Sequence, residues 1–236
     1  MNTALAPEQY ARRSFLYRKL GALGAQYVEV NGAAVASQFA GNQDEAVIAR
    51  KLGLADLSPL RRVGFKGAGA ADWLGANRVV VPEVNRLARQ DDGALVLRLG
   101  ANDIMVASDL HTRSSLPDGL LTVWNSLENP PAQARGFPVP RQDGYAWLVL
   151  SGDQAATCMA KICGVDLRTH KFDNGAIAQT SVARLGAVVA RNDINGTLAY
   201  HLFVDSASAE YFWDCVIDAM QEFGGKAVGI DALRSL

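Results

Sequence analysis

The clearest pattern of hydrophobic and polar positions lies between Asp205 and Gly225. Apolar side chains recur there at spacings of three and four residues, which places them on one face of an α-helix. Acidic side chains occupy the positions between them. The apolar positions are Ala209, Phe212, Trp213, Val216, Ile217, Met220 and Phe223. The pattern predicts an amphipathic helix that begins at 205–206, ends at 224–225 and covers an apolar layer.

Two runs rich in Val, Leu, Ile and Thr precede this helix, and Asn195-Gly196 between them is a strong turn signal. With one further strand and helix upstream and a short strand downstream, the predicted order is β-α-β-β-α-β. This is the ferredoxin-like split unit, in which two helices cover one face of an antiparallel sheet, so the fold class is α+β. The predicted elements are a strand at 145–150, a helix at 153–163, strands at 177–190 (with a break at Arg184 or Gly186 left open) and 197–204, a helix at 206–223 and a strand at 227–228.

In the first half of the chain the patterns of hydrophobic and polar positions are shorter. Pro7 favours a first helical turn and Gly24 favours a helix end, so a helix is predicted over 7–23. Alternating or β-branched runs predict the strands, and the acidic residues at 44–45 favour the start of a second helix. The remaining predictions are a strand at 25–30, a helix at 42–52, a hairpin of strands at 94–99 and 104–107, and a strand at 120–124.

Four prolines fall within residues 128–144. Proline cannot join the interior of a helix or a sheet, so this stretch is the predicted linker. We therefore expect two α/β subdomains, one over residues 1–135 and a ferredoxin-like one over residues 145–236.

Composition and charge narrow the class of protein. The chain has 236 residues, a net charge of −1 and scattered basic residues, so we expect no nucleic-acid partner. The N-terminus has no signal-peptide pattern and no apolar run reaches the ~20 residues of a membrane span, so we expect a cytoplasmic protein with no membrane partner. Three cysteines in apolar patterns favour reduced thiols, and without paired histidines we expect no metal site.

Few residues suggest chemistry by themselves. Asp91 and Asp92 could form a paired-carboxylate acid/base site, although the Gly93 that follows makes a solvated turn the simpler interpretation. The three histidines are isolated from any nucleophile signature, which favours surface or core roles. The aromatic residues at 145, 147 and 211–213 could stack on a flat ligand, but their spacing favours core packing.

Three segments resemble the N-terminal part of the glycine-cleavage T-protein (aminomethyltransferase) family. They are LGAQYVEV at 23–30, GLADLS at 53–58 and the stretch 63–74, which is similar to the family's "V-x-G-x-x-A-x-x-(F/W)-L" segment. Residues 191–204, Trp213-Asp214, Gly229 and Leu233-Arg234 are similar to the family's second domain. The resemblance implies a T-protein-like folate-binding fold of two α/β subdomains.

Within that superfamily, LRLGAND at 97–103 resembles the "LRLGPDE" hairpin of the sarcosine oxidase gamma subunit. The chain also stops at Leu236, where full T-proteins continue into a third domain. The resemblance implies a place in folate-linked one-carbon metabolism, in which a flavin partner oxidises methyl groups on amines and tetrahydrofolate captures them. Any flavin would lie on a partner chain, and flavoprotein subunits are the implied partners.

The sequence departs from the family's pattern where the folate would be held. Thr197 in NGTLAYH at 195–201 stands where T-proteins carry a carboxylate for the pterin ring, and a hydroxyl cannot replace a two-point ionic acceptor. Ile230 falls where the family has an arginine suited to a folate carboxylate. Aligning the strand after Gly93 leaves no carboxylate at the position of the family's aspartate; only a shift would bring Asp91 or Asp92 there.

Two hypotheses follow. The first is a T-protein-like accessory subunit of a flavin-dependent enzyme of amine N-demethylation, with its folate anchors replaced. The second is a stand-alone tetrahydrofolate-dependent aminomethyl or methyl transferase, whose site is rebuilt from Asp91 or Asp92, Arg191 and Tyr200. The candidates to line the folate cleft are Arg191, Thr197 and Tyr200. A free-standing relative with a role in iron–sulfur maintenance is disfavoured, because no cysteine lies in a motif typical of that class.

Overall fold

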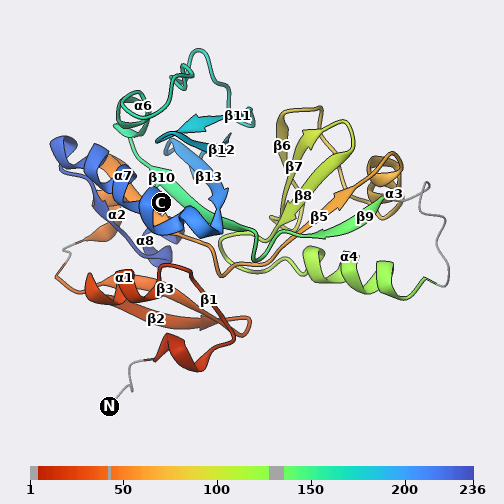
Figure 1. Cartoon of the computed structure of the whole chain (residues 1–236), viewed down its shortest axis with the longest axis horizontal. Helices are drawn as coiled ribbons and strands as arrows, with labels where there is room; N and C mark the ends of the chain where they lie inside the picture. The colour runs from red at the N-terminus through yellow and green to blue at the C-terminus, as the bar shows by residue number, and fades with distance from the viewer. Residues whose placement is uncertain (1–4, 42–43, 128–135) are drawn as a thin grey trace. The chain divides into compact units, whose positions relative to one another are not determined.

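The computed structural model describes residues 5–41, 44–127 and 136–236 (Figure 1). The chain forms two compact units. Unit 1 contains the described parts of Met1–Pro59 together with Tyr145–Asn174 and Ala178–Leu236, and unit 2 contains the described parts of Leu60–Gly144 together with Gly175–Ile177. The α+β class is confirmed, since helices and largely antiparallel sheets occur in both units.

Unit 1 is organised around a six-stranded sheet of order β11-β12-β13-β10-β4-β14. The strands β12, β13, β10 and β4 pair antiparallel, and β14 joins β4 in parallel. In chain order the strands are β4 (Gly53–Asp56), β10 (Tyr145–Ser151), β11 (Ile177–Val182), β12 (Leu185–Arg191), β13 (Ala199–Asp205) and β14 (Lys226–Ala227). The helices between them are α6 (Ala155–Met159) and α7 (Ala209–Met220).

The predicted β-α-β-β-α-β order is present from β10 to β14, with two differences. The run predicted at 177–190, with a break at Arg184 or Gly186 left open, is a hairpin, because Ala183 and Arg184 adopt left-handed conformations (φ 49° and 67°) and reverse the chain. In addition, β4 lies between β10 and β14. The ferredoxin-like unit is therefore completed by a strand that comes from the first quarter of the chain.

The predicted amphipathic helix is α7, which is preceded by a 3₁₀ turn, η2 (Ser206–Ser208), and followed by another, η3 (Gln221–Phe223). It ends at Gly224, which adopts the left-handed conformation (φ 67°) that suits glycine. Its apolar face packs against β13 and β14, while α6 packs beside it. Phe212, Trp213, Val216 and Met220 are all buried.

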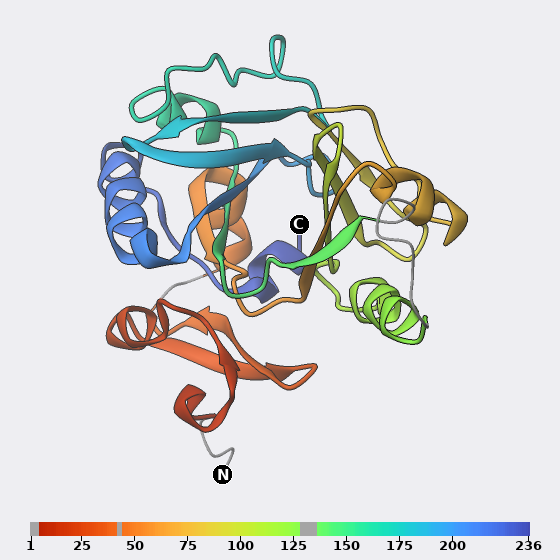
Figure 2. The same cartoon turned by 45° about the vertical axis from the view of Figure 1, so that its right-hand side comes forward.

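Residues 12–39 of unit 1 contain a three-stranded sheet of order β1-β3-β2, with α1 packed on β2 (Figure 2, orange-red). Its elements are η1 (Pro7–Gln9), β1 (Arg12–Arg13), α1 (Tyr17–Ala22), β2 (Ala25–Val30) and β3 (Ala33–Phe39). Two further helices complete the unit, α2 (Glu45–Leu52) and α8 (Ile230–Arg234), which packs against β3, β4 and α2.

The single helix predicted over 7–23 is wrong, because long-range bonds hold residues 12–16 outside a helix. Arg12 and Arg13 pair in parallel with Ala33 and Ala34 of β3. The Ser14 hydroxyl accepts a hydrogen bond from the Leu16 amide and donates one to the Asp56 carboxylate. A tertiary contact with β4 thus overrides the local helical pattern.

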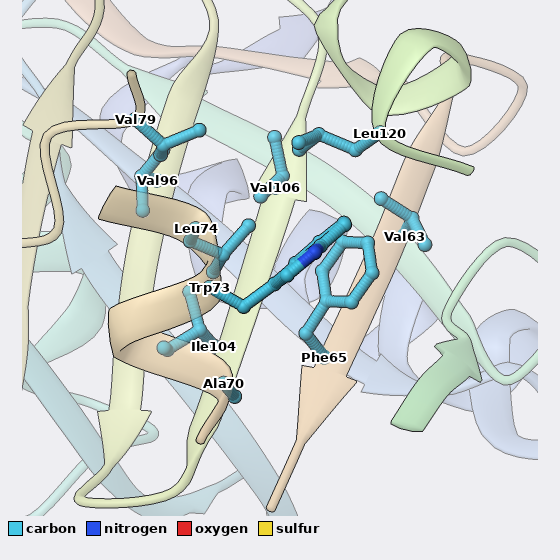
Figure 3. Close-up of a cluster of buried hydrophobic side chains, with 10 residues drawn as sticks. All are labelled: Val63, Phe65, Ala70, Trp73, Leu74, Val79, Val96, Ile104, Val106 and Leu120. Atoms are coloured by element: carbon cyan, nitrogen blue, oxygen red, sulfur yellow. The ribbon is translucent and has the colours of Figure 1, made fainter. Parts of the chain in front are cut away.

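Unit 2 contains a five-stranded antiparallel sheet of order β6-β7-β8-β5-β9. The predicted hairpin is confirmed as β7 (Leu95–Gly100) and β8 (Asp103–Ala107), and the other strands are β5 (Arg62–Lys66), β6 (Arg86–Arg89) and β9 (Phe137–Pro140). Helix α3 (Ala70–Ala76) covers one face with Trp73 and Leu74, which pack on Phe65, Val96, Ile104 and Val106 (Figure 3).

Residues 120–124 are not a strand, as predicted, but the second half of helix α4 (Leu116–Asn125). Leu116, Leu120 and Trp124 recur at helical spacing and pack against the cluster of Figure 3. Pro117 occupies the first turn, where its missing amide costs nothing, and the Ser114 hydroxyl accepts from the Leu116 amide. The residues that favour the start of this helix, Ser114 and Pro117, lie before the segment 120–124 for which a strand was predicted.

The predicted linker at 128–144 lies partly outside the described residues. Its described part forms β9, whose prolines at 138 and 140 are tolerated because β9 is an edge strand. Compact units need not be independently folding domains, so the division into 1–135 and 145–236 stays a prediction. By its contacts, however, the segment up to Pro59 belongs with the second half of the chain.

Candidate functional site

The three residues predicted to line a folate cleft lie on one hairpin of unit 1, β12–β13. Arg191 and Tyr200 are register partners on the two strands. Thr197 closes the connecting loop, where the amides of Ile194 and Thr197 each donate to the other's carbonyl at 2.9 Å. The fold thus brings Arg191 and Tyr200 side by side and leaves Thr197 at the end of the hairpin, partly exposed.

The guanidinium of Arg191 is engaged by unit 1 itself. Its Nε and one terminal nitrogen donate to the two carboxylate oxygens of Asp193 at 2.9 and 2.6 Å. The other terminal nitrogen donates to the carbonyls of Phe172 (2.7 Å) and Thr169 (3.2 Å). The pKa of Arg191 is raised, first by the hydrogen bonds to Asp193. In this two-point ion pair the side chains are only 10% and 18% exposed. The pair therefore compensates the charge of the guanidinium and fixes its orientation.

Tyr200 is equally committed to the core. The side chain is fully buried, its ring lies 6.3 Å from that of Phe172, and its hydroxyl donates to the carbonyl of Leu167. Burial raises the pKa of the phenol to about 12. The hydroxyl therefore stays protonated near neutral pH and acts here as a donor to backbone.

Asp193 was missed in the sequence, where residues 191–196 were read only as a turn. A carboxylate two positions after an arginine, before an Asn-Gly turn, is the signal that could have revealed the pair. Ile230, at the position expected to carry a family arginine, is the buried first residue of α8. No cation stands at that position.

Asp91 and Asp92 lie in unit 2, in the turn between β6 and β7. The Asp92 carboxylate accepts from the Ala94 amide (3.0 Å) and from the Ser114 hydroxyl (2.6 Å). The bond between Ser114 and Asp92 fastens the turn to the start of α4. Asp109 fixes the same segment by accepting from the Ser114 amide at 3.0 Å. Asp91 is exposed. These contacts agree with the interpretation of the pair as a turn, and a catalytic role for either carboxylate stays a prediction.

The motif GLADLS at 53–58 joins three segments of unit 1. Asp56 is buried and accepts from the Ser58 amide (2.9 Å) and the Ser14 hydroxyl. The Ser58 hydroxyl accepts from the Trp147 amide at 3.0 Å. These contacts stabilise the junction of β4, β10 and the N-terminal segment.

His201 is a core histidine, as its isolation in the sequence suggested. It is 1% exposed; its Nδ1 accepts from the indole N–H of Trp147 at 3.0 Å, and its Nε2 lies 3.4 Å from the Asn192 side-chain amide. The Trp147 ring also stacks on Phe203 at 5.4 Å. Core packing is thus confirmed for Trp147, whereas Tyr211, assigned the same role, is 50% exposed.

The described residues offer neither a cluster suited to a metal ion nor a helix suited to span a membrane. No group of three or more His, Cys, Asp or Glu side chains is placed to hold a metal ion. None of the described helices has the length and apolar character needed to cross a bilayer. The cytoplasmic location stays a prediction.

Comparison with known proteins identifies the fold. Residues 16–236 match the family model described as the GCVT N-terminal domain. An aminomethyltransferase of Halothermothrix orenii is 24% identical over 227 residues, covering 91% of this chain and 61% of the relative. Another, from Streptomyces coelicolor, is 27% identical and covers 93% of this chain and 59% of the relative.

Two solved structures share the arrangement. The glycine cleavage system aminomethyltransferase T from Bartonella henselae superposes with a TM-score of 0.72 at 15% identity, covering 95% of this chain and 61% of that chain. A chain of the heterotetrameric sarcosine oxidase from Corynebacterium sp. U-96, in complex with pyrrole 2-carboxylate, superposes with a TM-score of 0.66 at 23% identity, covering 91% and 97%.

The fold is therefore that of the aminomethyltransferase T-proteins. The chain belongs to the GCVT N-terminal domain family, since the match spans nearly all of it. It spans about three-fifths of the length of the curated relatives, and nearly the whole of the sarcosine oxidase chain.

Proposed function

We propose that this protein acts as a sarcosine oxidase gamma-subunit-like accessory chain of a flavin-dependent enzyme that N-demethylates amines in folate-linked one-carbon metabolism. The observation that carries the proposal is the set of contacts that Arg191 already makes within the protein. Its guanidinium is paired two-fold with Asp193 and bound to two backbone carbonyls, so it has little left to offer a folate carboxylate.

The other cleft candidates support the same conclusion. The hydroxyl of Tyr200 is already donated to backbone, Thr197 brings no carboxylate to the hairpin, and Ile230 brings no cation. A pterin ring and a glutamyl tail each need charged or two-point partners. The scaffold of a folate-dependent transferase is kept here, while its candidate anchors serve the protein's own core.

The likeness to a chain of a heterotetrameric oxidase suggests a role for the scaffold in subunit assembly. We propose that it docks onto flavoprotein subunits, that any flavin is held by those partner chains, and that tetrahydrofolate, if it takes part, is held mainly by groups outside the β12–β13 hairpin. Demethylation itself would then take place on the partner.

The test has two measurements on the full chain. Calorimetric titration with tetrahydrofolate, run beside a bacterial aminomethyltransferase as positive control, should show no saturable binding where the control saturates. Co-expression with flavoprotein subunits encoded by neighbouring genes should give a complex that purifies with stoichiometric flavin absorbance. The Asp193→Asn variant serves as a matched control for an Arg191 released from its partner.

Saturable binding of tetrahydrofolate by the chain alone, with transfer of a methyl or aminomethyl group, would establish the stand-alone transferase instead. In that case the Asp91→Ala/Asp92→Ala double variant should lose the transfer activity. Failure to assemble with any of the encoded flavoproteins would contradict the accessory role.

A further inference from the structure

A groove of about 550 Å³ lies in unit 1, away from the β12–β13 hairpin residues discussed above. Its walls are one face of α7, the segment that follows α6 and the turn between β11 and β12. This volume falls within the ~300–1,000 Å³ typical of sites for small molecules. The groove is large enough for a ligand with a bulky side chain.

The α7 wall carries Tyr211, Cys215 and Asp218, which lie on one helical face because they are spaced by four and three residues. The Tyr211 ring is half exposed, and its hydroxyl donates to the Ala183 carbonyl at 3.4 Å. A hydrogen bond with the Cys215 thiol is the main cause of the raised pKa of Tyr211. The Tyr211 side chain therefore reaches from α7 to the turn between β11 and β12.

The opposite wall is the turn at Ala183–Arg184. Both residues adopt left-handed backbone conformations, which are uncommon for residues other than glycine. Arg184 lines the groove together with Tyr211, and its positive charge partly opposes the rise in the pKa of the Tyr211 phenol. Arg184 is exposed, and within the described residues it forms no ion pair.

The charges along the groove leave one cation and one anion available. Lys161 also lines it, but this ammonium is paired with Glu222 (3.3 Å) and donates to the Ala219 carbonyl (3.2 Å). Asp218 is exposed and has no ion pair in the part of the chain that the structure describes. A guanidinium on the β11–β12 turn and a carboxylate on α7, of opposite charge, therefore line the same groove as Cys215.

We propose that this groove binds a zwitterionic amino acid with a large apolar side chain. The ligand's carboxylate pairs with Arg184, whose planar fork suits two-point contact, and its ammonium pairs with Asp218. The side chain lies on the Tyr211 ring and on the apolar floor formed by Ile162 and Cys163. A simple anion would be repelled by Asp218 and a simple amine by Arg184, so the site selects a molecule that carries both charges.

L-Phenylalanine is the probe, titrated into the full chain by calorimetry. Saturable binding is expected, and it should weaken at least tenfold in Arg184→Gln and in Asp218→Asn, while Arg113→Gln, a matched surface change in unit 2, should leave it unchanged. Alkylation of Cys215 should slow as the probe saturates. Because all three side chains are exposed, the variants should keep the native circular dichroism spectrum.

Two analogues test the need for both charges. N-acetyl-L-phenylalanine lacks the ammonium and phenethylamine lacks the carboxylate, and each should bind at least tenfold more weakly than L-phenylalanine. The proposal is overturned if L-phenylalanine shows no saturable binding up to its solubility limit. It is also overturned if both analogues bind as well as the amino acid, or if the variants bind it unchanged.

Discussion

Replacing Asp193 by asparagine tests the pairing on which the proposed function rests. The substitution keeps the shape of the side chain but removes the negative charge that faces Arg191 across two hydrogen bonds of 2.9 and 2.6 Å. Asparagine retains one oxygen acceptor and turns an N–H₂ group towards the guanidinium. Only the carbonyls of Thr169 and Phe172 would then accept from Arg191 at full strength.

The magnitude follows from the burial of the pair. Removing one partner of a buried ion pair costs ~3–5 kcal/mol, because the remaining charge is left without compensation. Here the two side chains are 10% and 18% exposed and two carbonyl acceptors remain, so the expected cost is reduced to about 2–3 kcal/mol. For a chain of this size, that is a fall of roughly 4–12 °C in the melting temperature.

Urea unfolding followed by circular dichroism measures the free energy of unfolding of three proteins: the wild type, Asp193→Asn, and the double variant Arg191→Met/Asp193→Asn. The double variant should be more stable than the single one, because it leaves no buried charge unpaired. A single variant within about 0.5 kcal/mol of the wild type would refute the reasoning. Arg191 would then be free to meet an anionic ligand, and the accessory role would lose its main support.

Other outcomes follow from the described contacts. Burial raises the pKa of Tyr200 from 10.0 to about 12, so the stability that its protonated phenol contributes is complete below pH 10.0 and is lost as the pH rises towards 12. In Tyr200→Phe, this part of the fall in the free energy of unfolding at alkaline pH should be absent. Burial likewise raises the pKa of Cys158 to about 11, so iodoacetamide should label Cys215 in the native protein and leave Cys158 unmodified until it unfolds, as peptide mass spectrometry would reveal. Gly229→Ala should destabilise by more than about 3 kcal/mol, because the new methyl group would overlap the backbone of β3. Gly119 lies in open space within α4, so Gly119→Ala should stabilise by about 0.5–1 kcal/mol. The melting temperature of each variant is compared with that of the wild type; no fall for Gly229→Ala, or no rise for Gly119→Ala, would contradict the respective prediction.

The sequence alone was sufficient where the signals are local. The apolar face of α7 and its glycine end are set by residues within twenty positions of one another. The β7–β8 hairpin and the turn after Asp92 depend on equally short separations. Periodicity and turn chemistry act over these distances, so their predictions were confirmed.

The site could be predicted only in part. The sequence placed Tyr200 on the second strand of the hairpin and Arg191 in the turn before it, whereas the structure pairs the two residues across β12 and β13. The role of Thr197 rests on the family resemblance and stays a prediction. The Arg191–Asp193 pair is local and had a signal in the sequence. That Arg191 donates to Thr169 and Tyr200 donates to Leu167 could not be predicted, since these contacts depend on how the 160–174 segment folds over the sheet.

Only the tertiary structure decides the conformation of those elements whose partners lie far away in the chain. Arg12 and Arg13 form a strand instead of a helix because β3 offers backbone partners and Asp56 binds Ser14. The ferredoxin-like sheet is completed by β4, which enters between β10 and β14 from ninety residues upstream. Local propensities differ by less than a kcal/mol per residue, so a few buried hydrogen bonds from distant segments are enough to override them.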